Sequence, residues 1–284
     1  MKRILSMVMM IVITVTSFGF CSYNSNSVVS ADTVSWPSGP GLVAETAVMI
    51  DASTGSVLFD KKCHQKMYPA SITKIMTALL TIENCNLDDT VTFSQSAIDT
   101  LEPEAANIGA VVGEEMSVKD CLYALMLQSA NEVASALAEH VSGSIEEFAK
   151  LMNKRAKQAG ANDAHFANAC GLFNKKHYVT AYDMAKIMQA ALQYPVFREI
   201  INSSSYTLPT DNKRKEPLTI SQRHQMVQPW NSFHYDGIIG GKTGFVNESG
   251  TTLVTSAQRD GMTLITVVLN SPGTNSYVDT TALL

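Results

Sequence analysis

Strand signals lie at the two ends of this chain, and helical periodicity fills the middle. The expected strands are residues 44–50, 56–59, 90–93, 240–246, 251–257 and 262–269. Between the last two runs, Asp260-Gly261 is a strong signal for a tight hairpin. The simplest packing joins both ends in one antiparallel sheet flanked by helices, with an inserted all-helical lobe. We therefore predict an α/β protein of the α+β type, with a cleft where its two lobes meet.

Capping residues mark the helices of the middle section. Ser or Thr stands three residues before an acidic residue at three points, each followed by apolar residues at helical spacing. The expected helices begin at Ser117, Asn131, Ser144 and Thr180 and run to about 126, 141, 160 and 194. Because the periodicity stops near Met126 and restarts after Asn131, residues 127–131 are expected to connect two buried helices.

The N-terminus is typical of an export signal. Lys2-Arg3 is followed by an apolar run from Ile4 to Phe20 and by the small residues Val29-Ser30-Ala31. We expect residues 1–31 to be a signal peptide and the protein to work outside the cytoplasmic membrane, in the periplasm, on the cell-wall side or secreted. If it were not cleaved, the same apolar run would tether the chain to the membrane.

Composition excludes some classes of function. The formal net charge of −5 argues against nucleic-acid binding, and the one basic cluster, Lys213-Arg214-Lys215, is expected to be a solvated loop. Beyond the export signal the cysteines are Cys63, Cys85, Cys121 and Cys170, which form no metal-binding spacing and are expected to be free, mostly buried thiols. The six histidines show no grouping, so we expect surface or partly buried roles, no metal site and no cofactor.

One candidate for chemistry is Ser71, which stands after Pro69-Ala70. Apolar residues from Ile72 onward predict a helix that begins at or beside Ser71, with the serine as its N-cap. Lys74 returns to the same side one turn later, within reach of the Ser71 oxygen. A desolvated lysine can take the proton of a serine, so the pair is a candidate nucleophile and base. The alternative is an ordinary capped helix with a solvated lysine.

Two further segments carry polar groups of the right kind. Ser129 can relay a proton and the amide of Asn131 can bind a substrate carbonyl, unless Asn131 is simply an N-cap. The glycines around Lys242-Thr243 allow a ligand backbone to approach a strand, and this cation and hydroxyl suit a carboxylate. A phosphate-binding P-loop is disfavoured, because Asp236 stands where that pattern needs glycine and no strand-loop-helix context follows.

Taken in order, Ser-x-x-Lys, Ser-x-Asn and Lys-Thr-Gly resemble the penicillin-recognising serine peptidase superfamily. The match is closer to its low-molecular-weight D-alanyl-D-alanine carboxypeptidases and extends from about Ala44 to the end. It implies a β-lactamase/transpeptidase-like fold. The segments that carry it are 69–80 (Pro-Ala-Ser-Ile-Thr-Lys-Ile-Met-Thr-Ala-Leu-Leu), 129–132 (Ser-Ala-Asn-Glu), 152–153 (Met-Asn), 166–168 (Phe-Ala-Asn), 171–172 (Gly-Leu), 180–185 (Thr-Ala-Tyr-Asp-Met-Ala) and 240–245 (Gly-Gly-Lys-Thr-Gly-Phe).

The resemblance implies an enzyme that removes the terminal D-alanine from peptidoglycan stem peptides ending in D-Ala-D-Ala, with β-lactams as inhibitors. Ser71 would be the nucleophile, Lys74 its base and Ser129 the proton relay. The implied substrate-binding residues are Asn131, Lys242, Thr243, Gly244 and Phe245, with the Ser71 and Phe245 N–H groups as the oxyanion hole. The scheme needs a lowered Lys74 pKa, which burial and the charge of Lys242 would supply.

The resemblance also sets expectations for the domain and for alternatives. Residues 32–284 would form the D,D-peptidase domain, cut short in a last helix that starts at Asp279, with no C-terminal β domain or membrane anchor. Val246 and Glu132 differ from the residues common in the family and could shift substrate preference. A non-catalytic penicillin-binding module and a D,D-endopeptidase remain open. A β-lactamase is less favoured, since no Glu-x-x-Leu-Asn lies between Ser129 and Lys242.

Overall fold

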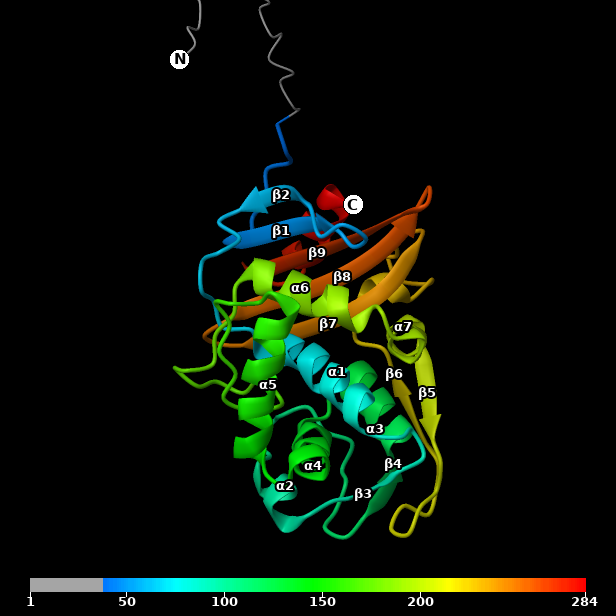
Figure 1. Cartoon of the computed structure of the whole chain (residues 1–284). Coiled ribbons are helices and arrows are strands. Elements are labelled where there is room, and N and C mark those ends of the chain that lie inside the picture. Colours follow the sequence, from blue (N-terminus) through cyan, green and yellow to red (C-terminus); the bar gives the residue numbers. More distant parts are fainter. Residues whose placement is uncertain (1–37) are drawn as a thin grey trace, which may run out of the picture. The chain divides into compact units, whose positions relative to one another are not determined.

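A computed structural model describes residues 38–284, so the expected signal peptide lies outside the described residues. A five-stranded antiparallel sheet runs in the order β2-β1-β9-β8-β7 (Figure 1), which confirms the predicted sheet from both ends of the chain. Its strands are β1 Thr46–Asp51, β2 Val57–Lys61, β7 Ile238–Val246, β8 Gly250–Arg259 and β9 Met262–Ser271. The turn between β8 and β9 has positive φ at Asp260 and Gly261, as the Asp-Gly pair predicts.

Alternating side chains let the sheet bury both of its faces. Val48 and Ile50 of β1 face the main core, whereas Ala47 packs with Val268 and Leu283 in a separate cluster. The first face is covered by α6 (Ala181–Ala191), which lies in front of the strands in Figure 1. The second face is covered by α8 (Asn275–Leu283), which starts four residues before the predicted Asp279.

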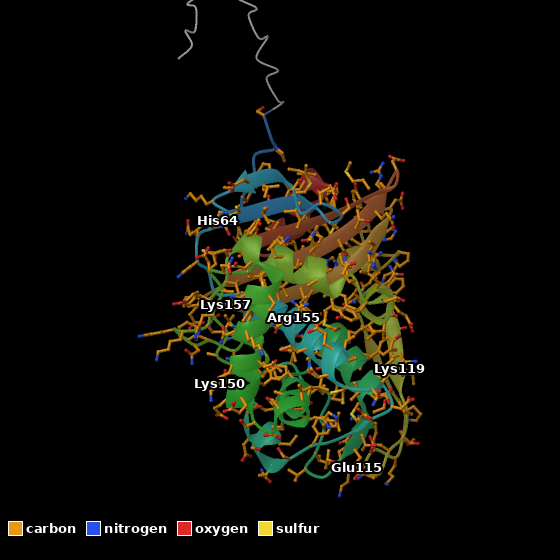
Figure 2. The ribbon with its side chains drawn as sticks, viewed as in Figure 1. His64, Glu115, Lys119, Lys150, Arg155 and Lys157 are labelled. Carbon is orange, nitrogen blue, oxygen red and sulfur yellow. The ribbon has the colours of Figure 1, made fainter. Side chains whose placement is uncertain are left out.

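The helical lobe lies beside the β7 edge of the sheet and is built around α1. Its helices are α1 Lys74–Asn84, α2 Gln95–Asp99, α3 Val118–Tyr123, the π-helical turn η2 Ala124–Gln128, α4 Asn131–Ser142, α5 Ile145–Ala159 and α7 Pro195–Asn202. The predicted caps are confirmed at Ser117, Ser144 and Thr180, whose side chains accept from backbone N–H groups three residues on. Arg155 of α5, labelled in Figure 2, pairs with Glu83 of α1 at 2.8 Å and fixes the two helices together.

The prediction of an all-helical lobe is wrong in two places. The expected strand β3 (Thr90–Thr92) pairs with an additional strand, β4 (Glu115–Ser117). A second additional pair is formed by β5 (Ser205–Leu208) and β6 (Leu218–Ser221). These strands are three or four residues long, too short for a clear period-2 pattern. Helices α2 and α7 were missed as well. Among the described residues, no helix is long and apolar enough to cross a membrane.

Candidate active site

Ser71 lies on a 3-10 turn, η1 (Ala70–Thr73), immediately before α1. The prediction of a serine N-cap is wrong, because neither end of this turn has a side-chain cap and α1 begins one turn later at Lys74. Ala70 has φ +52°, a left-handed conformation that L-residues avoid. Such strain persists only where surrounding contacts fix it, and it is common beside reacting groups. The turn therefore presents the Ser71 side chain rather than using it to cap a helix.

Lys74 points back to Ser71 and is completely buried. Its ammonium nitrogen lies 3.0 Å from Ser71 Oγ, 2.6 Å from Asn131 Oδ1 and 2.7 Å from the Cys170 carbonyl oxygen. These three contacts fix the position of the Lys74 amine, with one of its hydrogen-bonding directions pointing at Ser71 Oγ. The alternative of a solvated lysine on an ordinary helix is wrong for this residue.

The second segment lies where the π-helical turn η2 ends and α4 begins. Ser129 has φ +65° and is 4% exposed, and Asn131 is 5% exposed. Asn131 is the first residue of α4, whose N-cap is Ala130, so the N-cap alternative for Asn131 is wrong. Its carbonyl oxygen accepts from Lys74, which leaves its NH₂ group for a ligand. Within the described chain, no hydrogen bond joins the Ser129 hydroxyl to Ser71 or Lys74.

The third segment is β7, the edge strand of the sheet. Gly244 lies against the Ser71 turn: a Cβ at Gly244 would lie 2.8 Å from Ser71 N and 3.1 Å from Ala70 Cβ. On the neighbouring β8, Thr252 Oγ1 donates to the Pro69 carbonyl at 2.8 Å. Only a residue without a side chain lets the strand come this close, which explains the glycine.

Another turn packs against the Ser71 turn. Gly171 has φ +92°, and a Cβ there would lie 1.9 Å from the Ala70 carbonyl oxygen. The Asn168 side chain shapes this turn by accepting from Gly171 N at 2.7 Å and donating to Leu172 O at 3.0 Å. Asn168 thereby places the Cys170 carbonyl that receives Lys74. Asn168 and Gly171 belong to the segments that carry the family resemblance, but the sequence did not predict that they shape this turn.

These segments enclose a cavity of about 450 Å³ between β7 and the helical lobe. The predicted residues that line it are Ser71, Ser129, Asn131, Thr243, Gly244 and Phe245. The cleft between the lobes is therefore confirmed, and it brings together residues from both ends of the chain. Sequence reasoning missed Arg223, Glu102 and Glu104, which also line the cavity. Nothing in their local sequence marks them, because tertiary packing brings them here.

Three basic side chains lie at or near the cavity: Arg223 lines it, and Lys74 and Lys242 are buried beside it. Burial lowers the pKa of Lys74 to about 8; Cys170 and Glu132 act in the opposite direction, and the positive Arg223 lowers it further. Burial, Lys74 and Arg223 hold the pKa of Lys242 well below its usual range. The lowered Lys74 pKa agrees with the prediction. Arg223 contributes charge to it, and Lys242 and Lys74 also repel each other, since the charge of Lys74 lowers the pKa of Lys242. Lys242 is 1% exposed and donates to the Thr243 carbonyl at 2.9 Å, behind the cavity wall.

Comparisons with known proteins agree with this geometry. The model of the D-alanyl-D-alanine carboxypeptidase family matches residues 33–273. The chain belongs to this family. It is 35% identical over 232 residues to the D-alanyl-D-alanine carboxypeptidase DacF of Bacillus subtilis, with 80% of this chain and 57% of DacF covered. It is 32% identical to the D-alanyl-D-alanine carboxypeptidase of Streptomyces sp. (strain K15), with 82% of each chain covered.

The fold of this chain also matches that of a solved structure. The crystal structure of the Streptomyces K15 DD-transpeptidase superposes with a TM-score of 0.79 at 29% identity, over 87% of this chain and 97% of that one. The α+β sheet with its helical lobe is therefore the fold of this family. The chain spans just over half the length of DacF.

Outside the cavity of this carboxypeptidase family member, the described cysteines are all free, as predicted, and all but the partly buried Cys85 are buried. The expectation of surface or partly buried histidines is wrong for His177 and His224, which are 1% and 0% exposed. Both are neutral hydrogen-bonding groups, since burial lowers the pKa of each to about 3. His177 bonds Thr73 Oγ1 at 2.9 Å and so supports the end of the Ser71 turn.

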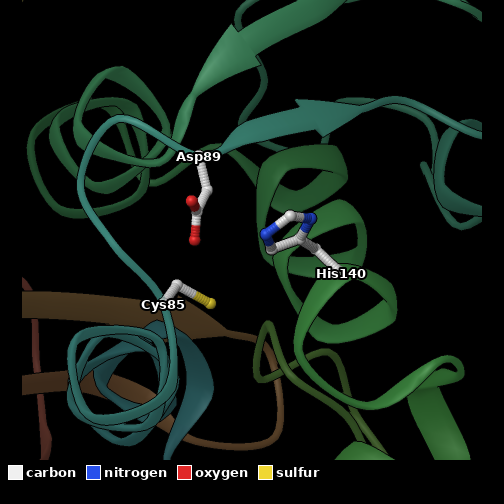
Figure 3. Close-up of side chains that lie close together, drawn as sticks. All are labelled: Cys85, Asp89 and His140. Carbon is white, nitrogen blue, oxygen red and sulfur yellow. The ribbon is translucent and has the colours of Figure 1, made fainter.

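One grouping of possible metal ligands was not visible in the sequence. Cys85, Asp89 and His140 come together at the ends of α1 and α4 (Figure 3), with ligand atoms within 4.8 Å of one another. Ligands of tetrahedral zinc lie about 3.5 Å apart, given metal–ligand lengths of about 2.0–2.3 Å. The Asp89 carboxylate already accepts from Asn86 N at 2.8 Å, and His140 is exposed. Asp89 thus closes the turn after α1, and we assign no metal to the three residues.

Proposed function

We propose that this chain is a serine-type D-Ala-D-Ala carboxypeptidase that forms an acyl-enzyme on Ser71. The observation that carries the proposal is the 3.0 Å contact between Ser71 Oγ and a buried Lys74 whose pKa is lowered to about 8. A lysine with that pKa is neutral in a useful fraction near neutral pH and can accept a proton from the attacking hydroxyl. Family membership supports the same reaction class.

In the first half-reaction, Ser71 Oγ attacks the carbonyl carbon of the penultimate D-alanine while Lys74 Nζ takes the hydroxyl proton. The Ser71 and Phe245 N–H groups would receive the oxyanion, a role supported by the close approach of Gly244 to the Ser71 turn. When the C–N bond breaks, a proton passes through Ser129 to the departing amine and free D-alanine leaves. Water then adds to the ester carbonyl, and Ser71 regains its proton as the shortened peptide is released.

The substrate we infer is a peptidoglycan stem peptide lying along the free edge of β7. An extended peptide can pair with an edge strand through main-chain hydrogen bonds. Asn131 Nδ2 would bind a peptide carbonyl, and Thr243 would bind the terminal carboxylate. Arg223 on the cavity wall supplies positive charge for that carboxylate, and Lys242 lies behind the wall. β-Lactams would acylate the same serine, and the protein would act outside the cytoplasmic membrane.

The proposal is tested with a fluorescent penicillin and a peptide ending in D-Ala-D-Ala. The wild-type protein is expected to be labelled and to release D-alanine, whereas Ser71→Ala loses both. Labelling without D-alanine release would indicate a penicillin-binding module instead. Equal labelling of wild type and Ser71→Ala would remove Ser71 from the mechanism. Folding of the alanine variant is checked by its thermal unfolding temperature.

A further inference from the structure

The residue after Asn131 is a buried carboxylate that the mechanism does not use. Glu132 is 0% exposed and lies on the first turn of α4. Its Oε1 accepts from the backbone N–H of Ile108 at 2.7 Å. Its neighbour Asn131 donates its own backbone N–H to the Ala106 carbonyl at 2.8 Å. Two consecutive residues of α4 thus bind the segment that follows α2.

That segment, residues 102–110, forms one wall of the cavity. Residues 102–106 line it opposite β7, and none of them belongs to a helix or strand. A segment without regular structure depends on hydrogen bonds from other elements for its position. A bond to a buried carboxylate is one of the stronger kinds, since one partner is charged. The wall is therefore held by the same helical turn that places Asn131 against Lys74.

Glu132 also follows directly on Asn131, whose amide oxygen accepts from Lys74 Nζ at 2.6 Å, so the same turn of α4 carries the carboxyl group and the contact that holds the amine. The negative form of Glu132 raises the pKa of Lys74, which opposes the lowering by burial and by Arg223. The groups that face Lys74 are Glu132, Arg223 and the Cys170 thiol, while Lys242 and His177 in turn experience its charge. Burial raises the pKa of Glu132 itself, and the backbone N–H of Ile108 acts against this. A carboxylate is costly to bury, so its place here needs a reason beyond packing.

We propose that Glu132 is a positioning residue with two roles: it holds the 102–110 segment against the bound peptide, and it sets the charge balance around Lys74. This inference rests on the proposed function. It predicts that the two roles separate in two conservative variants. Glu132→Asp keeps the charge but shortens the side chain and loses the bond to Ile108. Glu132→Gln keeps an acceptor for Ile108 and removes the charge.

The experiment measures KM for a peptide ending in D-Ala-D-Ala and the pH profile of penicillin acylation, using the full chain. Glu132→Asp is expected to raise the peptide KM about tenfold, the usual cost of one buried charged hydrogen bond, with an unchanged pH profile. Glu132→Gln is expected to shift the rising limb of acylation to lower pH, because Lys74 loses a neighbour that favours its charged form. Glu216→Gln, the same change on an exposed loop, is expected to alter neither.

Complete penicillin labelling marks each variant as folded. If Glu132→Asp does not fold, Ile108→Pro removes the same hydrogen bond from the other end and is expected to raise KM in the same way. Labelled variants with the wild-type KM and pH profile would overturn the inference while leaving the proposed function intact. A wild-type protein that takes no label would instead overturn the proposed function.

Discussion

A single carbon added at Gly171 is expected to have a large effect on catalysis. In Gly171→Ala the new Cβ would lie 1.9 Å from the Ala70 carbonyl oxygen, where contacts under 3.0 Å essentially never occur. The Ser71 turn must therefore move by about 1 Å, and a shift of that size costs about a hundredfold in rate. The positive φ of +92° adds about 1–2 kcal/mol of strain for alanine.

A matched glycine separates the clash from the strain. Gly143, the C-cap of α4, has φ +80°, and a Cβ added there would have nothing within 4 Å. Gly143→Ala is expected to cost about 1 kcal/mol in the free energy of unfolding and to leave acylation unchanged. The assay is the second-order rate of penicillin acylation together with urea unfolding of both variants. If Gly171→Ala acylates within about threefold of Gly143→Ala, the account of how Gly171 fixes the Ser71 turn is refuted.

Two further predictions follow from buried charge. Lys74 must be neutral to accept a proton, and its pKa is lowered to about 8. The rate of acylation is therefore expected to rise about tenfold per pH unit up to about pH 8 and then to level off. A flat profile from about pH 5.5 to 9.5 would exclude Lys74 as the base. Arg214 pairs with Glu114 at 2.9 Å, and their side chains are 15% and 2% exposed, so the expectation of a solvated loop is wrong for Arg214. Arg214→Met leaves Glu114 buried without its partner and is expected to lower the free energy of unfolding by about 3–5 kcal/mol, measured by urea titration. In the same titration the control Lys213→Met, at an exposed neighbouring residue, is expected to change the free energy of unfolding little.

The parts of the site that could be predicted are those set by local spacing. Three residues of helical chain bring Lys74 back to Ser71, and the spacing is nearly the same in the 3-10 turn as in the predicted α-helix. The glycines of β7 predict that a ligand backbone can approach the strand, whereas in the structure Gly244 admits the protein's own Ser71 turn. The Asp260-Gly261 pair predicted its hairpin for the same reason, since the turn type depends on two residues only.

The parts that could not be predicted depend on groups far apart in the sequence. The Cys170 carbonyl is a backbone group, so the residue type at this position does not predict that it accepts a hydrogen bond from Lys74. The burial of Lys242 behind the strand and the arrival of Arg223 at the cavity depend on how β7 packs against the helical lobe. The short strands β5 and β6 form because they pair with each other, and four residues carry too little pattern to show this.

The Ser71 turn owes its shape to two opposed contacts. Thr252 of β8 binds the Pro69 carbonyl on the sheet side, and Gly171 packs on the Ala70 carbonyl on the side of the helical lobe. Between these two contacts Ala70 is held at φ +52°, a conformation that would relax if either side withdrew. The geometry of the Ser71 turn therefore depends on the segments that pack against it, and not on the Ser-x-x-Lys sequence alone.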